Sequence, residues 1–130
     1  EYACRAGSAT LYSFGDDTSM ANKFAWDDDG AGLKSHPVGR KAPNSWGLFD
    51  MHGNVWEWCW DWYEYDYYKK PLGADPVNLS QAADRVIRGG GCYGYPRFCR
   101  SAHRFWRAPR QVYGDLGFRV VRVHRPAEGS

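Results

Sequence analysis

The sequence predicts an α+β domain that is irregular and loop-rich, with short antiparallel strands and little helix. Three observations favour this class. The chain has 130 residues, enough for one hydrophobic core, and 17% of them are aromatic. Its strand-like runs are short and lie between long glycine-rich segments, and no segment shows a sustained helical period. We therefore expect residues 1–123 to form a single domain and residues 124–130 to form a polar tail.

The first 45 residues alternate between short apolar runs and turn-forming residues. Residues 1–6 have the composition of a helix end, which Gly7 stops. Residues 11–14 predict a short strand, and residues 16–45 are mostly turn formers. The three aspartates at residues 27–29 lack the alternating spacing of a calcium loop, so we interpret them as a solvated turn.

Tryptophan recurs at every second position over residues 56–62, which is the period of an extended strand. The four indoles of Trp56, Trp58, Trp60 and Trp62 therefore share one face of the predicted strand. Because so much apolar surface is seldom left in water, we predict that this strand is the spine of the core. An exposed aromatic stripe that stacks on sugars is the alternative.

Two further strands are predicted, at residues 85–88 and 118–123. The first ends at three consecutive glycines, and the second alternates arginines with apolar residues. Residues 64–84 are irregular. Residues 89–117 show neither a helical nor a strand period, and a span of that length without regular structure in a compact domain is typically functional.

Charge is distributed unevenly along the chain, although the formal net charge is only +2. Residues 1–84 contain seven Lys or Arg and thirteen Asp or Glu, whereas residues 85–125 contain ten arginines and one acid, Asp115. A basic stretch with interleaved aromatics is typical of nucleic-acid binding. We favour internal pairing with the acidic first half instead, because all ten basic residues are arginines and a phosphate-binding patch usually includes lysines. No apolar run approaches the roughly 20 residues that cross a bilayer, so no membrane span is predicted.

The four cysteines, Cys4, Cys59, Cys92 and Cys99, show no Cys-x-x-Cys pair of the zinc type. They allow two disulfides in three pairings. We favour buried free thiols, because cysteine readily packs as a small apolar residue.

Six sequence blocks carry a family resemblance. The longest runs over residues 43–58 and ends in Gly-Asn-Val-Trp-Glu-Trp. The other five lie at residues 1–7, 36–39, 88–90, 100–102 and 117–119. Together they resemble the formylglycine-generating enzyme family, also called sulfatase-modifying factors, which has a C-type-lectin-like fold. The resemblance implies that fold here, and the N-terminal part of the family domain is missing from residues 1–130. Because residues 1–4 resemble the middle of an element, we expect the sequence to begin inside a longer protein.

The resemblance also implies a structural calcium site in the central block. Its ligands would be Asp50, the carbonyl groups of Gly53 and Val55, and the carboxylate of Glu57. Hard oxygen ligands arranged by a tight glycine turn suit Ca²⁺. The alternative is that Glu57 pairs with a buried arginine.

The copper site of this family is only half present. Its enzymes oxidise a substrate cysteine with copper(I) held by two thiolates, which lie four and nine residues after an Arg-Gly-Gly motif that a serine follows. Cys99 matches the ninth position, but Gly94 occupies the fourth and Gly91 replaces the serine. The resemblance in fold therefore does not carry the activity, and copper is not expected. Cys99 and His103 have the spacing of one helical face, but no further ligand accompanies them for a zinc-type site.

Residues 88–119 also resemble the variable region of proteins that retroelements diversify, which use the same fold. In those proteins a fixed frame alternates with positions that adenine-targeted mutagenesis of asparagine codons scrambles. The frame motifs Arg-Gly-Gly, Pro-Arg, Cys-Arg-Ser-Ala and Gly-Phe-Arg all occur here in register. The scrambled positions, which would bind the ligand, are Tyr93, Gly94, Tyr95, Phe98, His103, Phe105, Arg107, Ala108, Tyr113, Gly114 and Asp115. Four residues, Gly91, Cys92, Trp106 and Val112, depart from the usual template.

The composition of this segment agrees with a binding surface. Tyrosine, phenylalanine, glycine and histidine supply large contact area and adaptable backbone. A core would favour aliphatic side chains, yet Val112 is the only branched aliphatic between residues 89 and 115. Frame residues such as Arg100 or Arg104 are expected to fasten the segment to the core through guanidinium hydrogen bonds.

We therefore predict a non-catalytic protein that binds its ligand through residues 93–115. The ligand would be a protein or a cell-surface component, and nucleic acid is disfavoured. Two alternatives remain: an oxidase or pseudoenzyme of the formylglycine-generating type acting on a sulfatase-type cysteine, and a calcium-dependent sugar-binding lectin.

Overall fold

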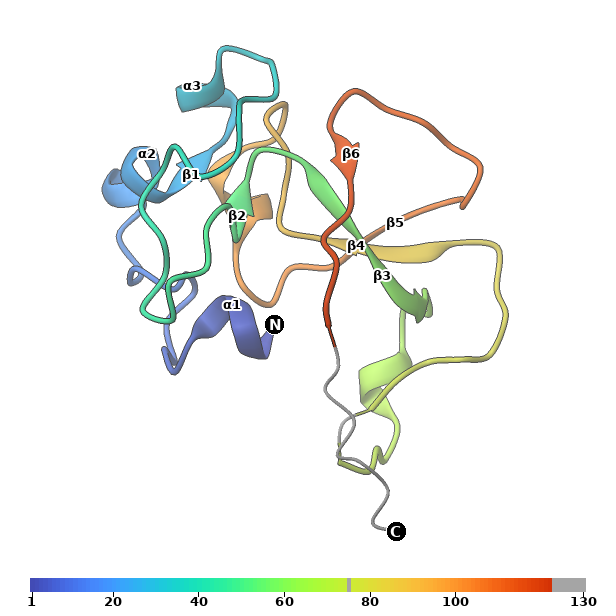
Figure 1. Ribbon diagram of the computed structural model, residues 1–130. Coiled ribbons are helices and arrows are strands. Elements are labelled where there is room, and N and C mark those ends of the chain that lie inside the picture. Colours follow the sequence, from blue (N-terminus) through green and yellow to red (C-terminus); the bar gives the residue numbers. More distant parts are fainter. Residues whose placement is uncertain (75, 123–130) are drawn as a thin grey trace, which may run out of the picture.

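The computed structural model describes residues 1–74 and 76–122 (Figure 1). Short helices from the first third of the chain lie on one side, and a four-stranded sheet from the later residues lies on the other. This is the irregular, loop-rich α+β class predicted from the sequence. Residue 123 and the predicted tail at residues 124–130 lie outside the described residues. None of the described helices is long and apolar enough to cross a membrane.

The first third contains single-turn helices joined by tight turns. The helix α1 (Tyr2–Arg5) ends where Ala6 adopts the left-handed conformation with φ 48°, just before Gly7, so the predicted helix end is confirmed. The strand predicted at residues 11–14 is wrong, because Tyr12 and Gly15 form only an isolated bridge across a turn.

Three further helices and one strand follow: η1 (Thr18–Met20), α2 (Ala21–Phe24), β1 (Ala25–Trp26) and α3 (Asp28–Ala31). None was predicted, because helices of three or four residues are too short to show a helical period. The solvated turn predicted at residues 27–29 is also wrong. Asp27 is buried, and its carboxylate caps α3 by accepting a hydrogen bond from the Gly30 N–H at 3.1 Å.

The main sheet has the strand order β5-β4-β3-β6. Its strands are β3 (Trp56–Trp62), β4 (Arg85–Arg88), β5 (Phe105–Arg107) and β6 (Leu116–Gly117). The strand β4 runs antiparallel to both β3 and β5, as predicted, whereas β6 runs parallel to β3. A second sheet pairs β1 in parallel with β2 (His52–Gly53). The connections contain the single-turn helices η2 (Tyr67–Lys69) and η3 (Pro96–Cys99).

The tryptophan strand forms as predicted, but it is not the spine of the core. Of its four indoles only that of Trp56 is buried, whereas Trp60 is 74% exposed. The pairing of β3 with β4 changes register between Trp58 and Trp62, so the strict alternation of faces is lost. Arg85 from β4 covers the outer indoles instead, with its guanidinium carbon 3.8 Å from the Trp62 ring centroid.

The core is built mainly from small side chains, which come from the first third of the chain and from residues 86–99. Ile87, Cys92 and Cys99 are the largest fully buried side chains. All four cysteines are free thiols, as favoured from the sequence, and Cys4, Cys92 and Cys99 are buried.

The strand predicted at residues 118–123 is wrong for residues 118–122, and residue 123 is not described. The strand β6 ends at Gly117, and Phe118, Val120 and Val121 are exposed. The pairing of β6 with β3 ends at Gly117, and beyond it Arg119 contacts β3 only through side-chain hydrogen bonds to Glu57.

Gly53 gives a stability prediction. Its φ is +81°, and a Cβ at this position would lie 2.3 Å from the Trp26 carbonyl oxygen. We expect Gly53→Ala to lower the free energy of unfolding by about 3 kcal/mol or more, measured by urea denaturation. Gly32→Ala is the matched control: φ is +59° there and no atom lies within 4 Å, so only the backbone cost of about 1 kcal/mol applies. Equal losses would show that the close approach of β1 and β2 is not what requires glycine.

Candidate ligand-binding pocket

A pocket of about 330 Å³ opens beside the connection between β5 and β6. Five of its eight lining residues are aromatic, and we call it the aromatic pocket. Seven of the eight are positions that the sequence predicted to be scrambled. The lining residues are Trp56, Tyr93, Gly94, Phe98, Phe105, Arg107, Tyr113 and Asp115.

Trp56, at the start of β3, is the only lining residue outside the predicted segment. It is 9% exposed, and its ring centroid lies 5.7 Å from that of Phe105. The Trp56 N–H donates a hydrogen bond of 2.7 Å to the Asp115 carbonyl, directly before the parallel pairing of β3 with β6 begins. The sheet thereby holds the end of the β5–β6 connection against the indole.

Gly91 lets the polar and aromatic parts of the pocket come together. A Cβ at this position would lie 2.6 Å from Asp115 Oδ2 and 2.8 Å from Trp56 Cδ1. A serine here, as in the enzymes of the resembling family, would collide with both groups. The pocket therefore has this shape only with glycine at residue 91, where the family pattern has serine.

The aromatic pocket contains one acid and one base. Burial raises the pKa of the Asp115 carboxyl, and the nearby positive charge of Arg107 opposes that rise. The Arg107 guanidinium carbon lies 4.8 Å from the Phe105 ring centroid and 5.0 Å from that of Tyr113. Such contacts stabilise a guanidinium electrostatically, and Arg107 Nη1 also donates a hydrogen bond to the Trp106 carbonyl at 3.1 Å.

The other four predicted positions lie outside the lining. Tyr95 is exposed beside Phe98, with ring centroids 6.4 Å apart. His103 does not line the pocket; its ring centroid lies 5.8 Å from that of Trp56, and burial lowers the pKa of its imidazole. Gly114 is exposed near the Tyr93 hydroxyl, and the Ala108 N–H bonds to the Gln111 side chain in the β5–β6 connection. The role of all eleven positions in binding stays a prediction.

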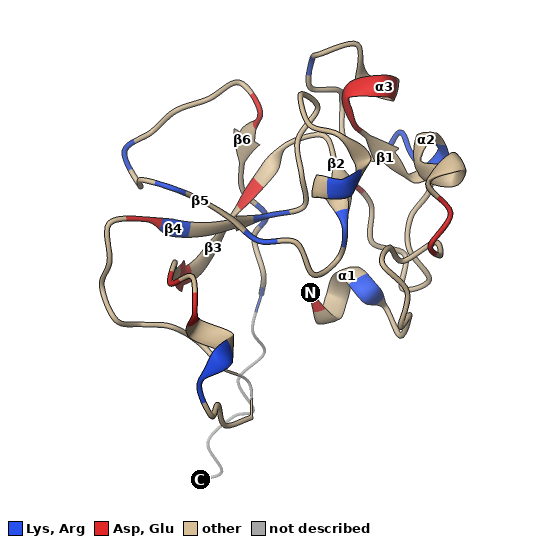
Figure 2. Cartoon of the chain, turned by 180° about the vertical axis from the view of Figure 1, so that it is seen from behind, with Lys and Arg blue, Asp and Glu red and all other residues tan. Residues whose placement is uncertain are grey.

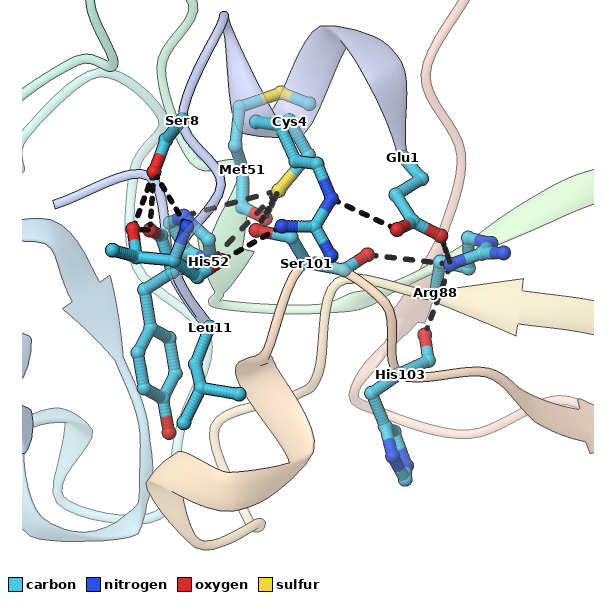
Figure 3. Close-up of polar contacts among 12 residues, drawn as sticks. Glu1, Cys4, Ser8, Leu11, Met51, His52, Arg88, Ser101 and His103 are labelled. Carbon is cyan, nitrogen blue, oxygen red and sulfur yellow. Dashed lines mark hydrogen bonds and ion pairs between the residues drawn. The ribbon is translucent and has the colours of Figure 1, made fainter. Parts of the chain in front are cut away.

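A hydrogen-bonded framework supports the segment from beneath (Figure 3). Arg88 donates to the carbonyl groups of Ser101 and His103 at 3.3 and 3.4 Å and forms an ion pair with Glu1 at 3.5 Å. Arg104 donates to the Glu64 carbonyl at 2.8 Å, as expected of a frame residue. Arg100 does not fasten the segment, because its Nε bonds only to the neighbouring Arg97 carbonyl.

His52 ties the framework to the first third of the chain. Its Nδ1–H donates to the Cys99 carbonyl at 2.7 Å, and its Nε2 accepts from the Ser13 N–H at 3.2 Å. Because Nε2 is an acceptor, the imidazole is neutral in this arrangement, and burial lowers its pKa.

Neither Trp56 nor Arg97, which lies over the Tyr95 and Phe98 rings, was predicted as a site residue.

The four residues predicted to bind calcium line a second pocket of about 480 Å³. Asp50 Oδ1 is buried without a hydrogen-bond partner, which fits an oxygen that faces a cation. Glu57 fits less well, because both of its oxygens accept hydrogen bonds from Arg119 at 2.8 and 3.0 Å. The alternative interpretation expected such a pair with a buried arginine, but Arg119 is exposed. This pocket shares no lining residue with the aromatic pocket.

The residues present do not fit the copper site of the resembling enzymes. Gly94, in the position of one thiolate, lines the aromatic pocket and has no side chain. Cys99, in the position of the other, is fully buried, and burial raises the pKa of its thiol far above the usual range. A buried thiol that stays protonated is a poor copper(I) ligand. No group of three or more His, Cys, Asp or Glu side chains suited to a metal occurs among residues 1–74 and 76–122.

A family model described as the sulfatase-modifying factor enzyme 1-like domain matches residues 1–124. The formylglycine-generating enzyme of Streptomyces coelicolor is 36% identical over 146 aligned positions, covering 100% of this chain and 46% of the enzyme.

Two solved structures are similar in fold. Variable protein 1 of Treponema denticola superposes with a TM-score of 0.83 at 33% identity, covering 89% of this chain and 42% of that protein. PvdO from Pseudomonas aeruginosa superposes with a TM-score of 0.77 at 33% identity, covering 90% and 47%. The chain thus spans less than half the length of each of these three proteins.

Proposed function

The chain belongs to the family of sulfatase-modifying factor enzyme 1-like domains, and we propose that within this family it is a non-catalytic binding protein with a retroelement-diversified surface. The aromatic pocket and its rim form that surface. The similarity in fold to a Treponema denticola protein that is named variable protein 1 supports the proposal.

One observation carries the proposal: predicted scrambled positions from separate parts of the sequence line one pocket. They come from the segment before η3, from η3 itself, from β5 and from the end of the β5–β6 connection. Frame residues between them, such as Cys99 and Ser101, are buried and hold the backbone. A surface that varies in sequence needs this division, because substitutions on the exposed side leave the supporting contacts unchanged.

The same division argues against the enzyme alternative. Catalysis in the resembling enzymes requires two reachable thiolates, and this chain offers one buried thiol at Cys99 and a glycine at residue 94. The sugar-binding alternative requires calcium at the ligand. Here the candidate calcium residues line a different pocket from the aromatic residues.

Sequencing this gene from many related isolates, together with any nearby repeat of its 3′ part, tests the proposal. We expect differences to concentrate at the eleven predicted positions, and the repeat to carry adenine-rich asparagine codons there. Differences spread evenly over residues 1–122 would contradict diversification by a retroelement, whatever the protein binds.

Calcium remains a separate proposal for the pocket beside Asp50. We expect Ca²⁺ at about 100 times its dissociation constant to raise the free energy of unfolding by about 2.7 kcal/mol, with Mg²⁺ giving less. The measurement is thermal or urea denaturation after exhaustive treatment with EGTA and readdition of each ion. Asp50→Asn should remove the effect, whereas Asp29→Asn, at an exposed carboxylate, should retain it. Equal stability with and without Ca²⁺ would contradict the calcium site and favour the ion pair between Arg119 and Glu57.

A further inference from the structure

Building on the proposed function, we propose that the aromatic pocket and two arginines stacked beside it form a docking surface for an acidic protein segment. In this arrangement a tyrosine or tryptophan side chain of the partner enters the pocket. Carboxylates on either side of that anchor bind Arg97 and Arg107.

The two arginines have matching environments. Arg107 lies over the Phe105 and Tyr113 rings, and the Arg97 guanidinium carbon is 4.9 Å from the ring centroids of both Tyr95 and Phe98. All four rings occupy predicted scrambled positions. Rings beneath a guanidinium restrict its motion. Arg107 Nη1 donates one hydrogen bond to the Trp106 carbonyl at 3.1 Å, and the remaining donors of the planar fork suit a carboxylate that accepts two hydrogen bonds.

Neither guanidinium forms an ion pair within the described part of the chain, although Asp115 lines the same pocket as Arg107. The ion pairs formed there by later arginines are Arg88 with Glu1 and Arg119 with Glu57, so the predicted internal pairing holds for those two. Residues 91–117 contain five arginines and one acid. Figure 2 shows Lys and Arg along β4, β5 and the β5–β6 connection. The arginines outnumber the one acid on this face, and the resulting excess of positive charge favours a partner of opposite charge.

The size and polarity of the pocket select the anchor. A volume of about 330 Å³ accommodates one large side chain, and the aromatic walls favour an aromatic one. Asp115 lies inside and forms no ion pair with another described residue, so an anchor that donates a hydrogen bond fits best. Tyrosine and tryptophan combine an aromatic body with a donor, and both are common anchors at the centre of interfaces.

A protein fits this surface better than a nucleic acid, which is the other polyanion that aromatic and arginine side chains recognise. A base entering the pocket would bring its phosphates close to the Asp115 carboxylate. The sequence also contains no lysine after residue 70, although proteins that bind along a nucleic-acid phosphate backbone usually use lysines together with arginines.

Panning a phage-displayed library of random peptides on the protein tests this inference, with counter-selection on the double variant Phe98→Ala/Tyr113→Ala. We expect the enriched peptides to carry net negative charge around a tyrosine or tryptophan. The best peptide, labelled with fluorescein, is then titrated by fluorescence anisotropy. Raising NaCl from about 50 to about 500 mM should weaken its binding about tenfold.

Variants separate the contribution of the two arginines from unspecific charge. Arg97→Ala/Arg107→Ala should weaken peptide binding by about 30- to 100-fold, the sum of two charge-assisted contacts. Arg97→Lys/Arg107→Lys keeps the charge but loses the planar fork, so about a fivefold loss is expected. Arg40→Ala removes one exposed arginine outside the segment and should stay within about twofold. Thermal denaturation checks that each variant is folded.

The possible outcomes distinguish this inference from the function on which it rests. Neutral or basic peptides that need Phe98 and Tyr113 would overturn the acidic partner and leave the binding function intact. Peptides that bind the counter-selected variant equally well, or no enrichment at all, would count against both. Tighter binding of a labelled single-stranded thymidine oligonucleotide than of the best peptide would replace the acidic protein with nucleic acid.

Discussion

Trp56→Ala should lower the free energy of unfolding by about 3 to 5 kcal/mol, the usual cost of removing a buried aromatic side chain. The indole is 9% exposed and packs near Phe105 and His103. The same change removes the one pocket residue that is not predicted to vary. Binding of any peptide that requires the aromatic pocket should therefore be lost as well. Urea denaturation and anisotropy titration, below the midpoint of unfolding, measure the two effects separately.

Trp60→Ala is the matched control for this prediction. Trp60 lies on the same strand, is 74% exposed and contacts Arg85, so a loss below about 1 kcal/mol and unchanged peptide binding are expected. A larger loss for Trp60 than for Trp56 would restore the tryptophan strand as the centre of the core.

His52→Ala is the second substitution with a large expected effect, about 3 kcal/mol of unfolding free energy. It leaves a cavity and removes the hydrogen-bond partner of both the Cys99 carbonyl and the Ser13 N–H. Ser101→Ala, which removes the hydroxyl near Cys4 and keeps the backbone bond to Leu11, should cost about 1 kcal/mol. Similar losses of unfolding free energy for both variants would contradict the larger contribution of the two His52 hydrogen bonds.

The same histidine makes stability depend on pH. Burial lowers the pKa of His52 in the folded protein, so the unfolded chain takes up a proton at a higher pH than the folded protein does. Stability is therefore complete above the unfolded value of about 6.5 and falls as the pH drops below it. His103 acts in the same direction. Urea midpoints between about pH 7.5 and 5.5 should decline in the wild type and decline less in His52→Ala.

The raised pKa of Asp27 and of Asp115 acts in the opposite direction at lower pH. Each folded carboxyl holds its proton at a pH where the unfolded chain has lost it, so this contribution is lost as the pH rises through the folded pKa from the unfolded value of about 3.9. A stability that rises on acidification from about pH 7.5 to 5.5 would contradict the buried neutral imidazole.

Local sequence patterns predict those elements that local interactions determine. The strand β4 lies where the sequence placed it, at residues 85–88, because two apolar residues flanked by arginines run into three glycines. The tryptophan strand was found from its period of two. Its burial was not, because the register change after Trp58 and the covering Arg85 depend on the partner strand.

The pocket could be predicted as a set of positions but not as a shape. The eleven positions came from the resemblance of residues 88–119 to a variable region. Their convergence on Trp56 depends on β6, whose two residues pair in parallel with β3 and are too few to leave a sequence signal. The stacking of Arg97 and Arg107 likewise follows from three-dimensional proximity, since the rings beneath Arg97 are close in sequence but those beneath Arg107 span residues 105–113.

The central claim is that a fixed framework presents a face that tolerates change and selects a partner. Two displayed libraries of equal size test it most directly, one randomised at the seven variable pocket positions and one at frame positions such as Arg88, Gly90, Cys99 and Ser101. The account predicts that most members of the first library resist protease as the parent does and yield selectable binders, whereas few members of the second remain folded. Equal loss of folding in the two libraries would contradict it.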